Sequence, residues 1–136
     1  MLIGGGGPRR TPALAAQYGD EYNQSFPKLD AVGSRIEVIN KALADAGRGP
    51  ESMVQSVALV AAVGQDEAEF ARRAGAIGRE PAELREHGIA GTVAEVVDRL
   101  KAMEADGVQR VYLQILDLAD LDHLDMFARE VRPQLG

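Results

Sequence analysis

The sequence predicts an α/β fold built on a parallel sheet, and three features support this prediction. Short apolar runs alternate with stretches of helical periodicity along the chain. The clearest run, 56–63, is continuously apolar after Ser56, which is typical of a strand covered on both faces. The helical stretches are long enough for right-handed crossovers between parallel strands. We therefore expect repeated βα units in a single domain that spans residues 1–136.

The predicted strands are short apolar segments that end in glycines or polar residues. Gly4 stops the first strand, and Gly64 stops the third. The second is a brief segment that begins at Glu21. The four predicted strands lie at 1–4, 21–23, 56–63 and 111–116.

Helices are predicted where apolar residues recur every three or four positions. Pro27 opens the second helix, which should end at Gly47. The fifth begins with a capping box, in which Thr92 accepts from a first-turn amide and Glu95 reaches back to the Thr92 amide. Gly107 ends that helix. The predicted helices span 11–18, 27–46, 66–76, 81–86, 92–106 and 121–131.

Composition excludes several classes of function. The net charge is −6, and no basic run exceeds two residues, which argues against binding to the phosphate backbone of nucleic acids. The absence of cysteine excludes disulfides, thiolate metal sites and a cysteine nucleophile, and it favours a cytoplasmic location. We expect neither a signal peptide nor a membrane anchor, because no long uncharged apolar stretch is present.

A glycine run, Gly4 to Gly7, follows the first predicted strand and precedes the first predicted helix. In that position, backbone N–H groups without side chains nearby can bind an anion, and the helix N-terminus adds partial positive charge. The same run is also compatible with a tight βα turn or a flexible N-terminal tail. Arg9 and Arg10 would either contact the anion or lie in solvent.

Ser25 follows the second predicted strand and is the second candidate for phosphate binding. The loops after parallel strands meet on one rim of a sheet, so its hydroxyl should lie on the same rim as the glycine run. Taken alone, Ser25 or Asn23 is better explained as the cap of the helix that starts near Pro27.

No metal or nucleophilic site is predicted. His87 and His123 lack partners at ligand spacing, and we expect both on the surface. No Ser-His-Asp arrangement or carboxylate pair stands out. Four aspartates near the C-terminus lack the pattern of a calcium loop and are expected to form a solvated helix start: Asp117, Asp120, Asp122 and Asp125.

With these elements placed, the sequence resembles the luciferase-like monooxygenase family, and particularly its F420-dependent oxidoreductase branch. The matching segments are a glycine turn, an Ala-Ala-x-Tyr helix end followed by an Asp-x-aromatic-Asn strand, a Gly-Thr-x-x-Glu helix start, and a final barrel strand. They stand in the family's order at 2–8, 15–23, 88–97 and 107–113.

The resemblance implies the C-terminal half of a (β/α)8 TIM-type barrel, because the family barrel is about twice as long as this chain. It implies that the cofactor phosphate binds Gly5, Gly6, Gly7 and Ser25, with coenzyme F420 as the cofactor and FMN as the alternative. Catalytic residues of the family come mostly from the first half of the barrel, so none is assigned here. Pro12 departs from the family pattern, since a helix capped by Thr11 would start later.

We expect from this resemblance a partial flavin- or F420-dependent oxidoreductase that supplies the cofactor-phosphate site and is inactive alone. The alternative is a non-catalytic half-barrel that acts as a dimerisation or interaction module. Open strand edges should drive association, either into a homo-oligomer or with a complementing half-barrel, and a further alternative is that a neighbouring gene encodes the missing half. The apolar inner face that supports this association is expected to consist of Val57, Leu59, Val111 and Leu113.

Overall fold

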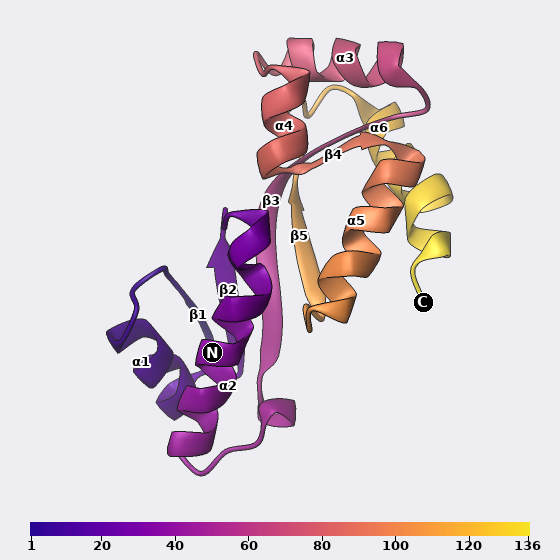
Figure 1. The fold of residues 1–136 in the computed structure, drawn as a ribbon. Coiled ribbons are helices and arrows are strands. Elements are labelled where there is room, and N and C mark those ends of the chain that lie inside the picture. Colours follow the sequence, from indigo (N-terminus) through magenta and orange to yellow (C-terminus); the bar gives the residue numbers. More distant parts are fainter. The chain divides into compact units, whose positions relative to one another are not determined.

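The computed structural model describes all residues 1–136, which divide into two compact units. The first unit contains Met1–Ala58 and Met103–Tyr112, and the second contains Leu59–Ala102 and Leu113–Gly136. Strands and helices alternate along the chain (Figure 1). No helix in the structure is both long enough and apolar enough to cross a membrane.

The first unit is built on a parallel sheet. Strand β1 (Leu2–Gly4) pairs with β2 (Glu21–Ser25), and β2 pairs with the first half of β3 (Val54–Gly64). Strand β5 (Arg110–Gln114) also pairs with β3. These strands confirm the predicted parallel βα pattern, with β2 and β3 longer than expected.

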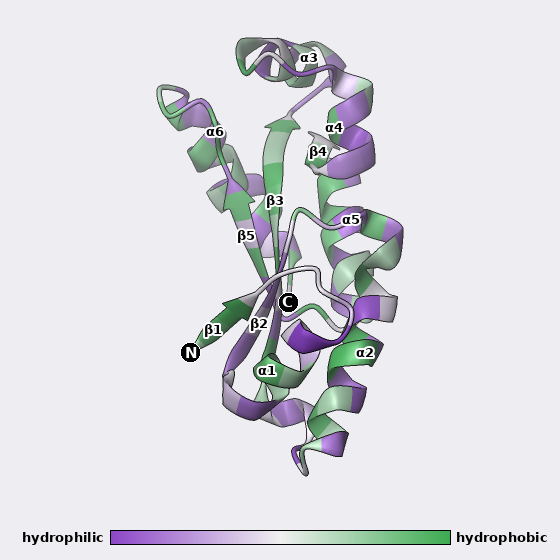
Figure 2. Ribbon diagram, turned by 90° about the vertical axis from the view of Figure 1, so that its left-hand side faces the viewer, coloured by the Kyte–Doolittle hydropathy of each residue, from purple (hydrophilic) through white to green (hydrophobic).

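Two helices pack on one face of this sheet. They are α1 (Arg10–Tyr18) and α2 (Val32–Asp45). The chain leaves α2 at Gly47, as predicted. Gly47 has a φ of +72°, and the Arg48 amide donates to the Leu43 carbonyl. Each large apolar side chain buried here contributes about 1.5–3 kcal/mol. Figure 2 colours the apolar residues of α2 green. The core cluster consists of Ala15, Ala16, Tyr22, Ile39, Leu43 and Met53.

Helix α2 begins later than its sequence pattern predicts. Phe26 has a φ of +49°, and Lys28 is extended, so the chain cannot become helical at Pro27. A single 3-10 turn, Leu29–Ala31, leads into the helix instead. Helix α1, by contrast, begins at Arg10 with Arg9 as its N-cap, so Thr11 is not the cap.

The second unit combines the end of β3 with β4 (Ile89–Thr92), in parallel register, and with α3 (Glu67–Ala76) and α4 (Pro81–His87). Helix α5 (Val93–Ala105) follows β4, and α6 (Leu121–Met126) continues through a π-helical turn, Phe127–Val131. One core cluster of this unit consists of Val60, Ala62, Phe70, Ala74, Leu84 and Ala90.

The sheet has five strands, so the prediction of four was wrong. The missed strand is β4, which has only four residues and ends at the start of α5. Gly91 lies inside it with φ at +134°, and Gly88 precedes it, so the sequence pattern is that of a loop leading into a capping box.

The capping box at the start of α5 forms in part. Glu95 accepts from the Thr92 amide at 2.7 Å, as predicted. The Thr92 hydroxyl donates to the same carboxylate at 3.0 Å rather than accepting from a first-turn amide. Arg85 also donates to Glu95, and these hydrogen bonds, with that of Arg85 the strongest influence, lower the pKa of Glu95 to about 2.

In the first unit, the prediction that Val57 and Val111 form an apolar inner face was wrong. Tyr22 packs in the core beneath α1 and α2, and the next residue of β2, Asn23, donates to Ser56 on the opposite face. Alternation along a strand therefore places Val57 on the helix side. On β5, Arg110 and Tyr112 contact Glu21 on the Asn23 side, so Val111 lies on the helix side as well. Leu59 and Leu113 belong to the second unit, where the neighbour of Leu59 on β3, Val60, packs with residues of α3 and α4.

Gln55 gives a testable prediction of stability. Its side chain is buried, and neither its amide nitrogen nor its amide oxygen has a hydrogen-bond partner. A buried unsatisfied polar group costs about 1–3 kcal/mol. We expect Gln55→Met, which keeps the chain length, to raise the midpoint of urea unfolding. The exposed Gln114→Met is the control, and a lower midpoint for Gln55→Met alone would show that the amide is satisfied.

Gly64, at the end of β3, gives a second prediction. A Cβ at this position would lie 2.3 Å from the Phe70 amide nitrogen, whereas a Cβ at Gly75 would meet no atom within 4 Å. We expect Gly64→Ala to destabilise the fold by about 1–3 kcal/mol through overpacking. Gly75→Ala, within α3, should stabilise it by about 0.5–1 kcal/mol. Thermal unfolding of both variants tests this, and equal melting temperatures would contradict it.

Candidate functional site

The glycine turn between β1 and α1 presents free backbone donors. Gly5 has a φ of +134°, which favours glycine. The N–H groups of Gly6 and Gly7, which lie beyond the β1–β2 ladder, donate to no acceptor in the chain. A Cβ added at Gly6 would meet no atom within 4 Å. The turn is therefore ordered by its carbonyl groups, described below, while its amides remain available to a ligand.

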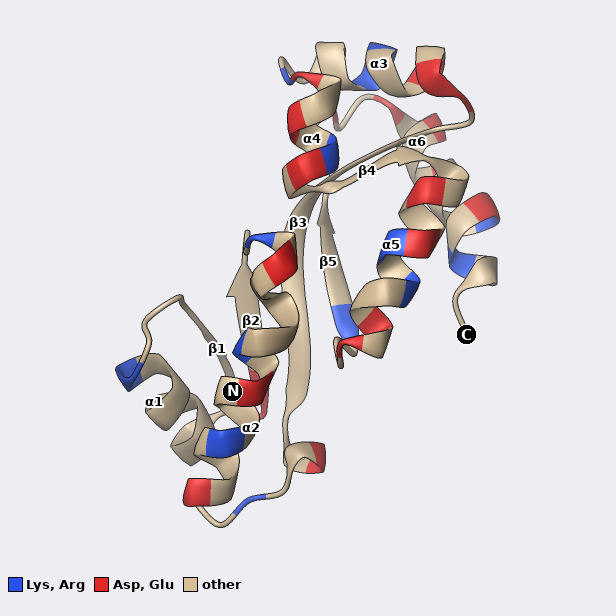
Figure 3. Ribbon diagram, viewed as in Figure 1, with Lys and Arg blue, Asp and Glu red and all other residues tan.

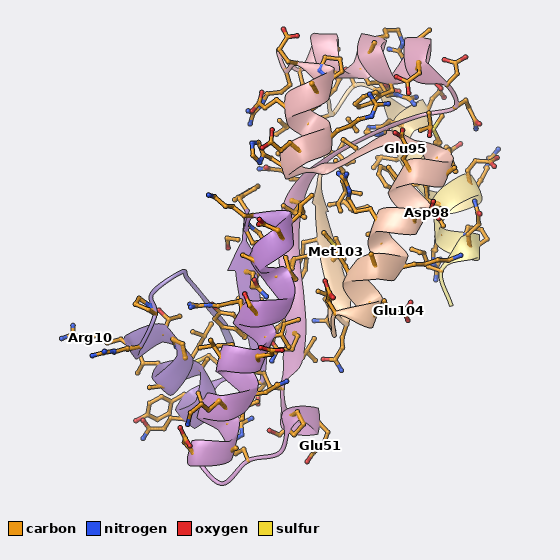
Figure 4. All side chains as sticks on the ribbon, in the orientation of Figure 1. Arg10, Glu51, Glu95, Asp98, Met103 and Glu104 are labelled. Carbon is orange, nitrogen blue, oxygen red and sulfur yellow. The ribbon has the colours of Figure 1, made fainter.

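The N-terminus of α1 adds to the positive character of this turn. Its N-cap residue makes no side-chain hydrogen bond, and its first turn contains no acidic residue. The first-turn amides and the helix dipole are therefore not compensated by protein groups. The start of α1 is blue in Figure 3 because of its arginines, and Figure 4 shows Arg10 directed away from the neighbouring elements. Arg10 is thus a solvated residue in this structure.

The carbonyl groups of the turn are bound by two side chains. Tyr22 donates from its hydroxyl to the Gly5 carbonyl at 2.6 Å. Arg35 donates from Nη2 to the Gly7 carbonyl at 2.6 Å and to the Gly5 carbonyl at 3.3 Å. The turn is consequently a fixed βα connection and not a flexible tail.

Ser25 lies at the same end of the sheet as the turn. The register pairs Gly4 with Asn23, and a Cβ at Gly4 would lie 3.8 Å from Ser25 Oγ. The Ser25 hydroxyl donates to Asn23 Oδ1 at 2.9 Å and is otherwise exposed. The N-cap of α2 is Ala31, which makes no side-chain hydrogen bond, so neither Ser25 nor Asn23 caps that helix.

Two residues at the turn were not identified from the sequence. Thr11 lies against it, since a Cβ at Gly7 would be 2.9 Å from Thr11 Oγ1. Its position in the first turn of a helix, directly after a glycine run, was the available signal. Arg35 contacts the turn from α2, 28 residues away in the sequence from Gly7, and no local pattern indicates that contact.

Polar side chains occupy the sheet face opposite α1 and α2. Glu21 is buried and accepts from Tyr112 Oη at 2.9 Å and from Arg110 Nη1 at 2.5 Å. Further along, Asn23 Nδ2 donates to Ser56 Oγ at 3.0 Å. Each of these buried polar groups is hydrogen-bonded, so this face is polar and ordered.

The second unit contains a buried charged cluster at the end of β3, and it overturns the surface assignment of His123. The Val63 amide donates to His123 Nε2 at 2.9 Å, and Arg73 donates to the Val63 carbonyl at 2.7 Å. Arg73 also pairs with Asp120, which caps α6. Asp120 is therefore not simply a solvated residue at a helix start, because it is paired with Arg73. His87 is exposed, as predicted. No group of three potential metal ligands occurs in the structure.

This cluster shifts two pKa values. Arg73 lowers the pKa of Asp120 to about 2, chiefly through its hydrogen bond. Burial lowers the pKa of His123 below its ordinary value of 6.5, and the Arg73 charge acts in the same direction. The neutral imidazole accepts the Val63 amide, so the cluster is satisfied as a structural element.

The lowered pKa of His123 predicts a pH dependence of stability. The unfolded chain takes up a proton near pH 6.5, whereas the folded chain resists protonation until a lower pH. Stability should therefore fall as the pH drops from 6.5 toward the folded pKa, with a further loss below pH 3.8 from Asp120. In His123→Gln, the free energy of unfolding measured by urea titration should change less between about pH 7 and 5 than in the wild-type chain. His87→Gln is the matched control, and an unchanged slope in His123→Gln would contradict the account.

The fold is similar to those of several solved oxidoreductases. The coenzyme F420-dependent tetrahydromethanopterin reductase from Methanopyrus kandleri aligns with 99% of this chain and 50% of its own, at 15% identity and a TM-score of 0.75. An F420-dependent secondary alcohol dehydrogenase aligns with 99% of this chain and 48% of its own, at 20% identity and a TM-score of 0.74. The EDTA monooxygenase from Chelativorans sp. BNC1 aligns with 96% of this chain and 44% of its own, at 18% identity and a TM-score of 0.76.

These comparisons confirm the predicted fold class. The chain has the α/β fold of half of a TIM-type barrel, and it spans about half the length of the solved structures that it matches. Identities this low establish the fold and do not transfer an activity. No protein-family model and no curated protein matches the sequence.

Proposed function

We propose that this chain forms the C-terminal half of a luciferase-like oxidoreductase barrel and binds the phosphate of its cofactor. The binding residues are Gly5, Gly6 and Gly7, with Ser25 at the neighbouring strand end. The observation that carries this proposal is the set of unpartnered N–H groups on an ordered turn before α1. Such a turn suits an anion of the size and charge of a phosphate.

We propose coenzyme F420 as the cofactor, with FMN as the alternative. Both carry a phosphate group, and the solved neighbours include F420-dependent enzymes and a monooxygenase in complex with FMN. The residues present fit this group, because a Cβ at Gly6 would project into open space and the first turn of α1 contains no carboxylate. When bound, the cofactor supplies hydride or oxygen chemistry. The residues of this chain bind and orient its phosphate, and we assign none of them a catalytic role.

A second barrel half is the proposed partner, provided either by a copy of this chain or by a complementing chain. Within the first unit, β1 and β5 each pair on one side only, which leaves two strand edges open. Leucines of the second unit are also exposed, with Leu118 at 82% and Leu121 at 67%. A closed barrel would satisfy such edges. The alternative function, a non-catalytic dimerisation or interaction module, shares this association but predicts no cofactor binding.

Cofactor titration separates these two functions. We expect the purified chain to quench or shift the fluorescence of F420 or FMN in a saturable manner, while light scattering shows an assembly larger than the monomer. Binding should also raise the melting temperature, because a ligand that binds only the folded state stabilises it. Association without binding of either cofactor would support the interaction module instead.

Gly6→Ala tests the turn itself. The added methyl group meets no protein atom within 4 Å, so the free energy of unfolding should change by less than about 0.5 kcal/mol. The methyl group should hinder close approach of the phosphate to the backbone and weaken FMN or F420 binding about tenfold. Gly75→Ala, remote in sequence and equally unobstructed, is the control. Unchanged affinity in Gly6→Ala would place the phosphate elsewhere.

A further inference from the structure

Arg35 connects α2 to the glycine turn. Its Nη2 atom donates to the carbonyl oxygens of Gly7 and Gly5, and its Nε donates to Tyr22 Oη at 2.9 Å. The guanidinium carbon lies 5.7 Å from the centroid of the Tyr22 ring. One side chain thus contacts both carbonyls and the phenol that donates to one of them.

Tyr22 is held rigidly, and it therefore fixes the position of the hydroxyl that contacts the glycine turn. Its side chain is fully buried in the core of the first unit, while its hydroxyl reaches the Gly5 carbonyl. The Gly5 carbonyl therefore accepts from two donors, Tyr22 Oη and Arg35 Nη2. Because Arg35 itself donates to the Tyr22 hydroxyl, the phenol proton is directed toward Gly5.

The fixed Gly5 carbonyl determines where the next amide points. A trans peptide is planar, so the Gly6 N–H points away from the Gly5 carbonyl with which it shares the peptide plane. Holding that carbonyl against Tyr22 and Arg35 directs the Gly6 N–H to the opposite side. Pro8 has no N–H, so the contact of Arg35 with the Gly7 carbonyl fixes the exit of the turn without orienting another donor.

We propose that Arg35 is a positioning residue for the cofactor phosphate. It acts through the Gly5 and Gly7 carbonyls and holds the Gly6 N–H in the donating orientation, so the affinity for phosphate depends on the guanidinium fork. This inference rests on the proposed function of the turn. A lysine at this position would keep the positive charge but could not reproduce the planar fork, so Arg35→Lys separates positioning from charge alone.

The test compares the affinities of the full chain for FMN and for riboflavin, which lacks the phosphate. Arg48→Lys is the matched control, because Arg48 also binds backbone carbonyls of the first unit, those of Ala16 and Ser52. We expect the wild-type chain and Arg48→Lys to prefer FMN. Arg35→Lys should lower that preference at least about tenfold, the loss expected for hydrogen bonds to a charged group. The carbonyl carbon signals of Gly5 and Gly7 should shift in Arg35→Lys without any ligand.

The possible outcomes distinguish this inference from the proposed function. An unchanged FMN preference in Arg35→Lys, with a wild-type preference present, overturns the positioning role and leaves the phosphate site standing. Equal wild-type affinities for FMN and riboflavin overturn the phosphate site itself, and that comparison does not involve Arg35. If Arg35→Lys fails to fold, Tyr22→Phe removes one donor to the Gly5 carbonyl and retains the ring. It should weaken the preference in the same direction, and an unchanged preference in that variant overturns the inference.

Discussion

The parallel register of β1, β2 and β3 is the constraint on which the candidate site depends. Gly4, the last residue of β1, pairs with Asn23, and β2 ends two residues later at Ser25, so these two strands end on the same side of the sheet. In a parallel sheet every βα loop leaves from that side, and short connections bring their backbone groups together. A shift of register by one residue would turn Tyr22 out of the core and remove its hydroxyl from the Gly5 carbonyl.

The first unit therefore uses its two sheet faces differently. The helix side buries apolar side chains and holds Tyr22 rigidly, so the phenol contributes both to core packing and to the order of the turn. The opposite face carries hydrogen-bonded polar groups around Glu21 and Asn23. Because buried polar groups require partners, this face is specified by side-chain geometry more strictly than an apolar face would be. The sequence led us to expect an apolar inner face that includes Val57 and Val111, and in the first unit the face opposite the helices is polar instead.

The sequence predicted the elements whose signals are local. Continuous apolar residues located β3, and glycines located the ends of α2 and α5, because strand burial and left-handed helix ends depend on a few adjacent residues. The glycine turn was identified for the same reason. Contacts across the chain were not predicted. His123 stands among aspartates that suggest solvent, yet Asp120 pairs with Arg73, 47 residues away. Arg35 and the short strand β4 likewise depend on partners that no local pattern reveals.

We propose that the Gly5 to Gly7 turn is a preorganised phosphate site, and a crystal structure of the chain with bound FMN tests this proposal most directly. We expect the phosphate within about 2.7–3.2 Å of the Gly6 and Gly7 amide nitrogens, with Ser25 Oγ on the same side and the Arg35 contacts retained. A phosphate bound elsewhere, with the turn amides facing only solvent, would contradict it.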